Sequence, residues 1–158
     1  NPAAIAAYPM YRGLAKLIGM NVLPTGETFE EELQTLKRCY EDHDFIFVHY
    51  KPADAAGEDG DFSAKVRALE RFDELLPNLL DIEYDVLVVA GDHSTPSVLG
   101  AHSWHPVPFM LHSPWTRADG IAEFTERACA AGSVGSIPAM NAMLLVLAHA
   151  GKLGKYGP

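Results

Sequence analysis

The fold of this chain is decided by two apolar stretches, Asp44-Phe-Ile-Phe-Val-His-Tyr50 and Asp85-Val-Leu-Val-Val-Ala90. Both are nearly continuous in aromatic, aliphatic and β-branched residues, a composition typical of strands that are covered on both faces. A polar segment containing glycine follows each of them and ends the strand. Strands of this kind occur mainly in sheets with helices on either side, so the two stretches favour an α/β fold.

Helical patterns lie between and around these strands. Thr28 stands three residues before Glu31, the spacing at which each side chain can hydrogen-bond a free backbone amide at a helix start. From there the apolar positions predict a helix as far as His43, and a second one begins at Phe62. The remaining pattern predicts strands over Ile5–Tyr8 and Val107–Leu111, and helices over Tyr11–Met20, Ile121–Ala131 and Pro138–Ala150. This alternation predicts an α/β fold with a mostly parallel sheet sandwiched by helices.

The composition excludes several classes of function. The chain has 158 residues, 21 of them acidic and 12 basic, and its formal charge of -9 repels nucleic acid and anionic lipid. No apolar run reaches the roughly 18 residues that a membrane span requires. Cys39 and Cys129 are interpreted as reduced packing residues, because disulfide-dependent domains are usually richer in cysteine. We expect a soluble, cytoplasmic protein without nucleic-acid or membrane partners.

Side chains of metal-ligand type follow both decisive strands: Asp54 and Glu58 after the first, and Asp92, His93 and His102 after the second. In α/β folds the ligand site lies at the carboxyl ends of the strands, so we expect these five side chains to meet at one edge of the sheet. Carboxylate oxygens mixed with imidazole nitrogens suit Zn, Mn or Co. The sequence therefore predicts a centre that binds two divalent ions.

Five motifs in one collinear order carry a family resemblance. They are Tyr8-Pro-Met-Tyr-Arg-Gly13, Lys51-Pro-Ala-Asp-Ala-Ala-Gly-Glu-Asp-Gly60, Gly91-Asp-His-Ser-Thr-Pro96, His102-Ser-Trp-His-Pro-Val-Pro108 and Gly151-Lys-Leu-Gly-Lys-Tyr-Gly157. Together they span essentially the whole chain. In this order they resemble the archaeal-type, 2,3-bisphosphoglycerate-independent phosphoglycerate mutases of the alkaline phosphatase superfamily.

The resemblance implies an alkaline-phosphatase-like core with two divalent ions, Mn, Mg, Zn or Co. Asp54, Glu58 and His102 match the ligands of one ion, and Asp92 and His93 match the pair that holds the other. Arg12 matches a basic residue near the transferred phosphate, where a guanidinium can bind two phosphate oxygens at once. The implied activity interconverts 3-phosphoglycerate and 2-phosphoglycerate through a phosphoserine intermediate.

The chain departs from that family's pattern in two ways. Glu58 stands where many relatives have histidine, which hardens the site and favours Mn or Mg over Zn. The serine that becomes phosphorylated and a further aspartate ligand, which the family carries in an N-terminal segment, have no counterpart here. We therefore expect residues 1–158 to form the C-terminal part of a metalloenzyme domain. Its partner would be the N-terminal remainder of the same polypeptide, and alone it would not turn over substrate.

Two other hypotheses stay open on sequence grounds. Similar metal loops would serve a phosphatase, a phosphopentomutase-like enzyme or a phosphonate-handling relative of the same superfamily. Because the nucleophile is missing, a non-catalytic metal-binding module is also compatible with the sequence.

Other conspicuous residues are interpreted as packing groups. His49 alternates within a buried strand and is expected to be a core histidine. The last helix carries an apolar face, which we expect to lie in the core and which consists of Met140, Met143, Leu144 and Leu147. Trp104 is expected to form a wall of the ligand pocket.

Overall fold

The computed structural model describes residues 1–154, so the end of the closing motif, residues 155–157, lies outside the described part of the chain. The chain divides into two compact units. The first comprises Asn1–Ile82 together with Ser97–Ala101, and the second comprises Glu83–Pro96 together with the chain from His102 onward.

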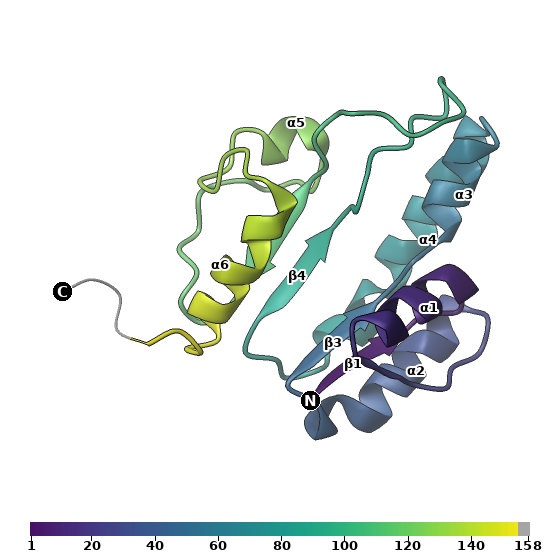
Figure 1. Cartoon of the computed structure of the whole chain (residues 1–158). Helices are drawn as coiled ribbons and strands as arrows, with labels where there is room; N and C mark the ends of the chain where they lie inside the picture. Colours follow the sequence, from purple (N-terminus) through teal and green to yellow (C-terminus); the bar gives the residue numbers. More distant parts are fainter. Residues whose placement is uncertain (155–158) are drawn as a thin grey trace. The chain divides into compact units, whose positions relative to one another are not determined.

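The first unit is built on a three-stranded parallel sheet. β1 (Pro2–Ile5) is the central strand, with β2 (Asn21–Val22) and β3 (Phe45–Val48) on either side (Figure 1). Ala3 of β1 pairs with Ile46 of β3 and with Asn21 of β2. The central position explains why Ala3 is fully buried, as are Ala4 and Ile5 after it. The α/β fold and the parallel sheet predicted from the sequence are therefore confirmed.

The first strand lies earlier than the sequence pattern indicated. The apolar run Ile5–Tyr8 predicted it, but β1 ends at Ile5 and α1 (Pro9–Leu17) begins four residues later. Proline at the first position of a helix is favoured, since its missing amide would have no partner there. The small side chains of Ala3 and Ala4 gave a weak strand signal, although they suit a central strand with helices close to both faces.

Helices cover both faces of this sheet. The ring of Tyr11 on α1 stacks on His49, with the ring centroids 3.6 Å apart. Tyr50, one residue further along the chain, instead packs against Phe29 of α2 (Phe29–Cys39) and Phe72 of α4 (Phe62–Leu80). Consecutive side chains of an extended strand point to opposite faces, so α1 covers one face and α2 and α4 cover the other. The stacked, half-buried ring of His49 agrees with its interpretation as a core residue.

The start of α2 confirms the local signal read from the sequence. The Thr28 hydroxyl accepts a hydrogen bond from the Glu31 amide at 3.3 Å, and the Glu31 carboxylate accepts one from the Thr28 amide at 3.0 Å. The helix ends at Cys39, and a single 3₁₀ turn, η1 (Tyr40–Asp42), continues it to the neighbourhood of His43. The predicted and observed ends therefore agree.

The segment after β3 differs from expectation. It was predicted as a loop, yet α3 (Pro52–Glu58) forms there and packs on α4. Pro52 begins the helix, and the alanines inside it are strong helix formers. Seven residues are too few to show a periodic apolar pattern, which is why the sequence missed this helix.

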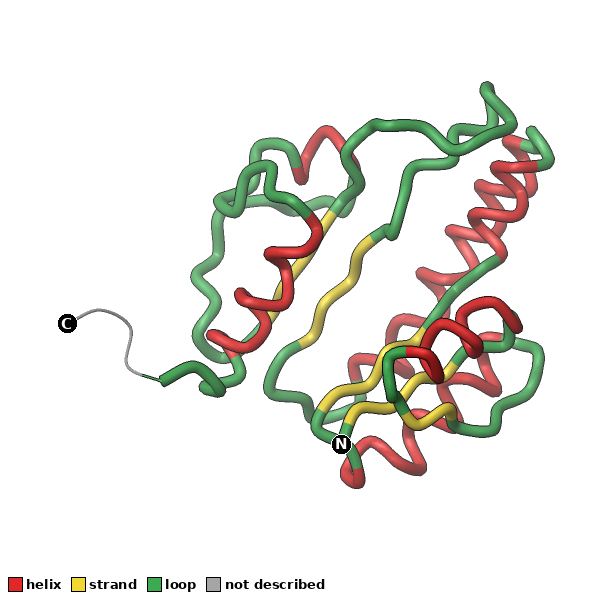
Figure 2. The backbone as a smooth tube through the Cα atoms, in the orientation of Figure 1, coloured by secondary structure: helices red, strands yellow, loops and turns green. Residues whose placement is uncertain are grey.

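The second unit contains an antiparallel strand pair. β4 (Leu87–Ala90) pairs with β5 (Phe109–His112), so that Leu87 faces His112. The segment between the two strands has no helix, and Figure 2 shows it as continuous loop. An isolated bridge joins Ser94 to Ser103, whose amide donates to the Ser94 carbonyl at 2.9 Å. Both strands were expected, but their antiparallel pairing was not.

The helices of the second unit are shorter than predicted. Only α5 (Glu126–Cys129) forms within Ile121–Ala131, while Pro138–Ala150 contains the 3₁₀ turn η2 (Ala139–Asn141) and α6 (Ala142–His149). Thr125 caps α5 by accepting a hydrogen bond from the Ala128 amide. The backbone of Thr125 is extended, so the residues before it lie outside the helix.

Several apolar side chains expected in the core are exposed. Met140 is 85% exposed, and Met143 and Leu144 of α6 are 43% and 57% exposed. Trp104, expected to line a pocket, is 86% exposed. The prediction of a buried face was therefore wrong for these three residues of the last helix, whereas Leu147 is half-buried. Periodicity shows which side chains share a face and does not show what covers that face.

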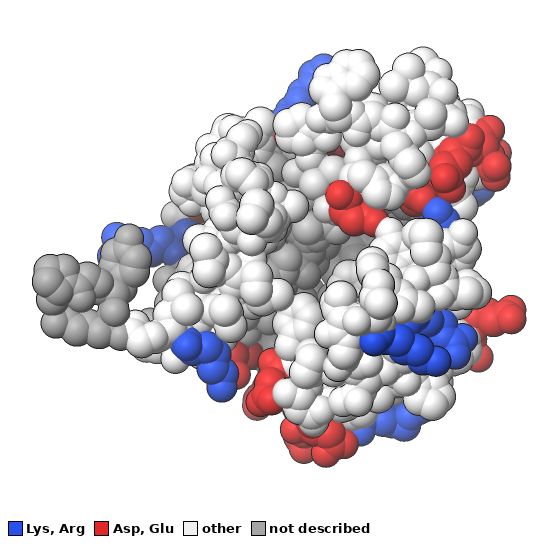
Figure 3. Space-filling view, viewed as in Figure 1, with Lys and Arg blue, Asp and Glu red and all other residues white. Residues whose placement is uncertain are grey.

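Charge and hydropathy on the described surface agree with the composition. On the face drawn in Figure 3, Lys and Arg are interspersed with acidic and uncharged residues, so no continuous basic surface forms there among the described residues. No helix in the described part of the chain combines the length and apolar character that crossing a membrane demands. Cys39 and Cys129 are free thiols, and burial raises the pKa of Cys39.

Candidate metal centre

The first unit holds a carboxylate cluster, made of Lys51, Asp54 and Glu58. α3 follows the carboxyl end of β3, and its first turn carries Asp54. The Lys51 ammonium donates hydrogen bonds to the carboxylates of both Asp54 and Glu58, at 3.1 Å in the second case. The side chains of Asp54 and Lys51 are only 17% and 24% exposed, so this ion pair is partly shielded from solvent. Two of the predicted ligands are thus brought together around one internal cation.

The protonation of Lys51 reflects this arrangement. Burial acts to lower the pKa of Lys51, but the hydrogen bonds from its ammonium to Asp54 and Glu58 outweigh burial and raise the pKa above its ordinary value. The ammonium also lies 5.0 Å from the ring centroid of Tyr8, a distance suited to a cation–π interaction. Lys51 therefore stays charged and neutralises part of the negative charge of the cluster.

Arg12, the basic residue predicted to contact phosphate, also belongs to the first unit and lies in the first turn of α1. Its amide donates to the Tyr8 carbonyl at 3.4 Å, and its side chain is exposed. Tyr8 thus contacts Arg12 through the backbone and Lys51 through its ring. Along the chain, Arg12 follows β1 and Lys51 follows β3, and the carboxyl ends of strands are where an α/β fold places a ligand.

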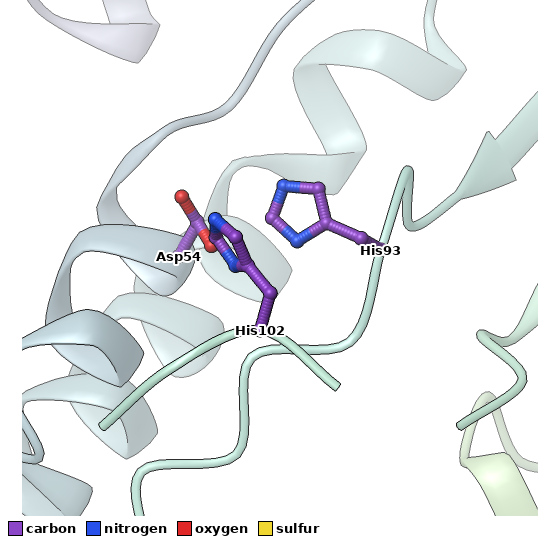
Figure 4. A group of neighbouring side chains, drawn as sticks. All are labelled: Asp54, His93 and His102. Carbon is purple, nitrogen blue, oxygen red and sulfur yellow. The ribbon is translucent and has the colours of Figure 1, made fainter. Parts of the chain in front are cut away.

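The second unit holds an imidazole cluster, made of Asp92, His93, Thr95 and His102. It follows the carboxyl end of β4. The rings of His93 and His102 lie 4.0 Å apart at an angle of 57°. Figure 4 shows these two rings beside one another, and it shows Asp54 on α3. The structure therefore brings three of the predicted ligands together within the second unit.

The spacing of Asp92 and His93 fits a shared ion. Oδ2 of Asp92 lies 3.5 Å from Nε2 of His93. Two ligands bound at about 2.0 to 2.1 Å in a tetrahedral geometry lie about 3.3 Å apart. These two atoms thus have nearly the separation of a ligand pair, with the oxygen and nitrogen donors that Zn, Mn and Co accept.

Two residues that contribute to the clusters were missed by sequence reasoning. Lys51 and Thr95 both lie inside motifs quoted above, next to predicted ligands, but neither is a common metal ligand. Thr95 is only 4% exposed, and burial of a hydroxyl requires hydrogen-bond partners. The sequence shows that Thr95 lies within a ligand motif. Only the packed structure shows that its hydroxyl is buried.

The fold and these clusters define the class of the protein. It is an α/β protein with carboxylate and imidazole groups at the carboxyl ends of strands, the arrangement of a metal-dependent enzyme. Residues 2–149 match the family model described as the Metalloenzyme superfamily. The chain belongs to this family.

Curated relatives are closely similar in sequence. The chain is 52% identical over 156 residues to a "Probable 2,3-bisphosphoglycerate-independent phosphoglycerate mutase" of Thermosipho melanesiensis. It is 54% identical over 159 residues to the protein of the same name from Thermus thermophilus. Each match covers 99% of this chain and 39% of the relative, so the chain spans well under half the length of these relatives.

Two solved structures share the fold. A protein from Pyrococcus horikoshii matches all of this chain and 51% of its own, with a TM-score of 0.94 and 27% identity. The cofactor-independent phosphoglycerate mutase from Thermoplasma acidophilum matches 95% of this chain and 36% of its own, with a TM-score of 0.71 and 22% identity. The second likeness concerns the fold alone.

Proposed function

We propose that this chain is the metal-binding portion of a phosphoglycerate mutase that interconverts 3-phosphoglycerate and 2-phosphoglycerate through a phosphoserine intermediate. The observation that carries the proposal is 52% to 54% identity, over 99% of the chain, to relatives named as probable 2,3-bisphosphoglycerate-independent phosphoglycerate mutases. The carboxylate and imidazole clusters supply the types of ligand that such chemistry needs. We also propose that the protein acts in the cytoplasm, where phosphorylated metabolites are found.

Two divalent ions are part of this proposal. Asp54, Glu58 and His102 would bind one, and Asp92 and His93 would bind the other. Such ions polarise a phosphoryl group and stabilise the negative charge that spreads over its oxygens. Three carboxylates among the five ligands favour Mn or Mg over Zn.

The basic residues of the first unit have a role in the same proposal. Arg12 would bind phosphate oxygens through two parallel hydrogen bonds, which orient the group as well as neutralise it. The exposure of Arg12 leaves the residue accessible to such a ligand. The guanidinium remains charged at any physiological pH, so it can serve as a fixed positive group.

A further part of a longer polypeptide would complete the enzyme. In this proposal that part supplies the phosphorylated serine and one more aspartate ligand. The outer side of α1 is in keeping with such a partner, because Leu14, Leu17 and Ile18 are 52%, 82% and 68% exposed. Apolar side chains grouped in this way on a helix commonly mark a surface that another element covers.

Ion counting tests the assignment of ligands. Calorimetric titration with Mn²⁺ should give two ions per wild-type chain, with the first bound more tightly. Asp54→Ala and His102→Ala should weaken the same ion, and Asp92→Ala should weaken the other. Loss of different ions from the Asp54 and His102 variants would contradict the proposed grouping.

Complementation tests the activity. The segment of the Thermus thermophilus relative that this chain does not match would be produced as a separate polypeptide and mixed with the chain. We expect no turnover by the chain alone and measurable conversion of 3-phosphoglycerate to 2-phosphoglycerate by the mixture, detected with enolase. Release of inorganic phosphate without 2-phosphoglycerate would favour a phosphatase. Metal binding without either reaction would favour a non-catalytic module.

A further inference from the structure

One buried hydroxyl group connects the two histidines of the imidazole cluster. Oγ1 of Thr95 lies 3.0 Å from Nδ1 of His93 and 3.0 Å from Nδ1 of His102. Thr95 is 4% exposed, so water does not compete freely for these hydrogen bonds. The hydroxyl therefore contacts the same ring atom of both imidazoles.

The hydrogen-bonding capacity of the hydroxyl limits the states of the two rings. A threonine hydroxyl has two acceptor lone pairs and one proton. It can accept N–H from both rings, or donate to one ring and accept from the other. In the first arrangement both rings are protonated on Nδ1, and both Nε2 atoms keep a lone pair. In the second arrangement a neutral ring that accepts from Thr95 carries its proton on Nε2 and cannot bind a metal there.

The position of Asp92 favours the first arrangement for His93 when an ion is bound. Its Oδ2 lies 3.5 Å from Nε2 of His93, on the side of the ring away from Thr95. An oxygen and a nitrogen at this separation suit two ligands of one ion, which requires a lone pair on Nε2. The tautomer of a metal-binding histidine is commonly fixed by a hydrogen bond donated from its other nitrogen.

We propose that Thr95 is a positioning residue whose hydroxyl accepts Nδ1–H from both His93 and His102, thereby fixing both Nε2 atoms as metal ligands. The inference rests on the metal centre in the proposed function. It deepens that function by giving the two histidines a common support. Because one oxygen serves both rings, a change at Thr95 acts on both imidazoles together.

Histidine tautomers in the chain loaded with Zn²⁺, used as a diamagnetic probe ion, provide the first test. Long-range proton–nitrogen correlation spectra at about pH 8, where unperturbed imidazoles are neutral, distinguish Nδ1–H from Nε2–H. Spectra of His93→Ala and His102→Ala chains would assign the signals. We expect both rings to carry the proton on Nδ1. An Nε2–H signal from either ring of the wild-type chain would overturn the proposal without requiring any variant to fold.

Metal affinity provides the second test. Thr95→Val keeps the shape of the side chain and removes the hydroxyl, and it should weaken Mn²⁺ binding roughly 10- to 100-fold, the range typical for groups that support metal ligands. It should also return the two rings to mixed tautomers. Thr95→Ser restores the hydroxyl and should return the affinity to within about threefold of wild type. Circular dichroism would confirm that both variants fold.

Ser103→Ala supplies a matched control. The Ser103 hydroxyl also lies near an imidazole in the same unit, 2.8 Å from Nδ1 of His105, but His105 is not assigned as a ligand. Loss of the Ser103 hydroxyl should leave Mn²⁺ affinity unchanged. Wild-type affinity in the Thr95→Val chain would overturn the inference while leaving the metal centre intact. Absence of Mn²⁺ binding by the wild-type chain would instead overturn the metal centre of the proposed function, and the inference about Thr95 with it.

Discussion

The carboxylate cluster and the imidazole cluster occupy equivalent positions after strands, yet they are held by opposite means. Around Asp54 and Glu58 the organising group is the charged ammonium of Lys51, the residue that precedes the helix α3 carrying both carboxylates. Around His93 and His102 it is the neutral hydroxyl of Thr95, set in an irregular loop. The first cluster already contains a cation, which any bound ion must compete with or displace. In the second cluster the imidazole nitrogens are the proposed metal ligands. The Thr95 hydroxyl that orients them carries no charge, so it does not repel a bound ion.

The largest expected effect is the loss of the imidazole ligands. In a reconstituted enzyme, His93→Ala and His102→Ala should each lower kcat by at least about 100-fold, because a missing ligand removes part of the charge stabilisation of the transition state. The measurement is conversion of 3-phosphoglycerate in Mn²⁺ buffer.

His149→Ala is the control for these variants. His149 lies in the same unit, where its Nδ1 is 2.7 Å from the buried Ser113 hydroxyl, so it has a packing role outside the cluster. Its loss should affect stability more than turnover. Undiminished activity in the His93→Ala enzyme would remove the imidazole cluster from the mechanism.

The second prediction concerns Glu32, a buried carboxyl group that, unlike Asp54 and Glu58, is not paired with the Lys51 ammonium. Glu32 is 3% exposed and accepts a hydrogen bond from the Ala7 amide at 2.6 Å. Burial raises the pKa of Glu32 to about 7, and the hydrogen bond from Ala7 opposes part of this rise. Between about pH 4.5 and pH 7 the unfolded chain releases this proton before the folded one does. As the pH rises through this range, the free energy of unfolding should therefore fall by roughly 2 to 3 kcal/mol, and it should level off at higher pH.

Urea denaturation at pH 5 and pH 8 checks this prediction. Glu32→Gln removes the ionisable group and should abolish most of the decrease. Circular dichroism follows the long helices of the first unit, whereas both tryptophans, Trp104 and Trp115, belong to the second unit and report on that unit by fluorescence. An equal decrease in wild type and Glu32→Gln would assign the pH dependence to other groups.

The third prediction probes the internal cation directly. Lys51→Met removes a positive charge that repels a bound ion and occupies its ligands, so it should tighten Mn²⁺ binding at the carboxylate cluster by roughly 3- to 10-fold, the scale of a partly shielded ion pair. Lys51→Arg keeps the charge and should not tighten it. Free Mn²⁺ measured by electron paramagnetic resonance gives the affinity.

Lys37→Met is the matched control, because Lys37 forms a surface ion pair with Asp81 at 3.8 Å, outside the cluster. Its removal should leave Mn²⁺ affinity unchanged. Weaker binding in the Lys51→Met chain would mean that the ammonium orients the carboxylates for the ion and does not compete with it.

The smallest expected effect compares the helix caps of the two units. Thr28→Ala removes a reciprocal cap from α2, which has 11 residues, and should lower the free energy of unfolding by about 1 kcal/mol. Thr125→Ala removes a cap from α5, which has four residues, and should cost less than about 0.5 kcal/mol, since a single turn contributes little independent stability. Equal losses in thermal or urea unfolding would show that helix length does not govern the difference.

Much of the fold was predictable because its signals are local. The Thr28–Glu31 cap depends on a spacing of three residues, and the strands around Phe47 and Val88 depend on short apolar runs. The types of candidate ligand were also readable, since each motif places them directly after a strand. The short helix α3 and the exposure of α6 were not, because neither follows from periodicity alone.

The sequence by itself determined the α/β class, the cap of α2, the acidic character and the motifs that contain the candidate ligands, because these depend on residue type and near neighbours. Only the tertiary structure decided that β5 pairs antiparallel with β4, that Lys51 bridges two carboxylates, and that one Thr95 hydroxyl lies between His93 and His102. Those contacts depend on how the backbone turns between residues and on which atoms are left facing one another after packing. A hydroxyl can support two imidazoles only when all three groups converge within hydrogen-bonding distance, and residue spacing does not specify that convergence.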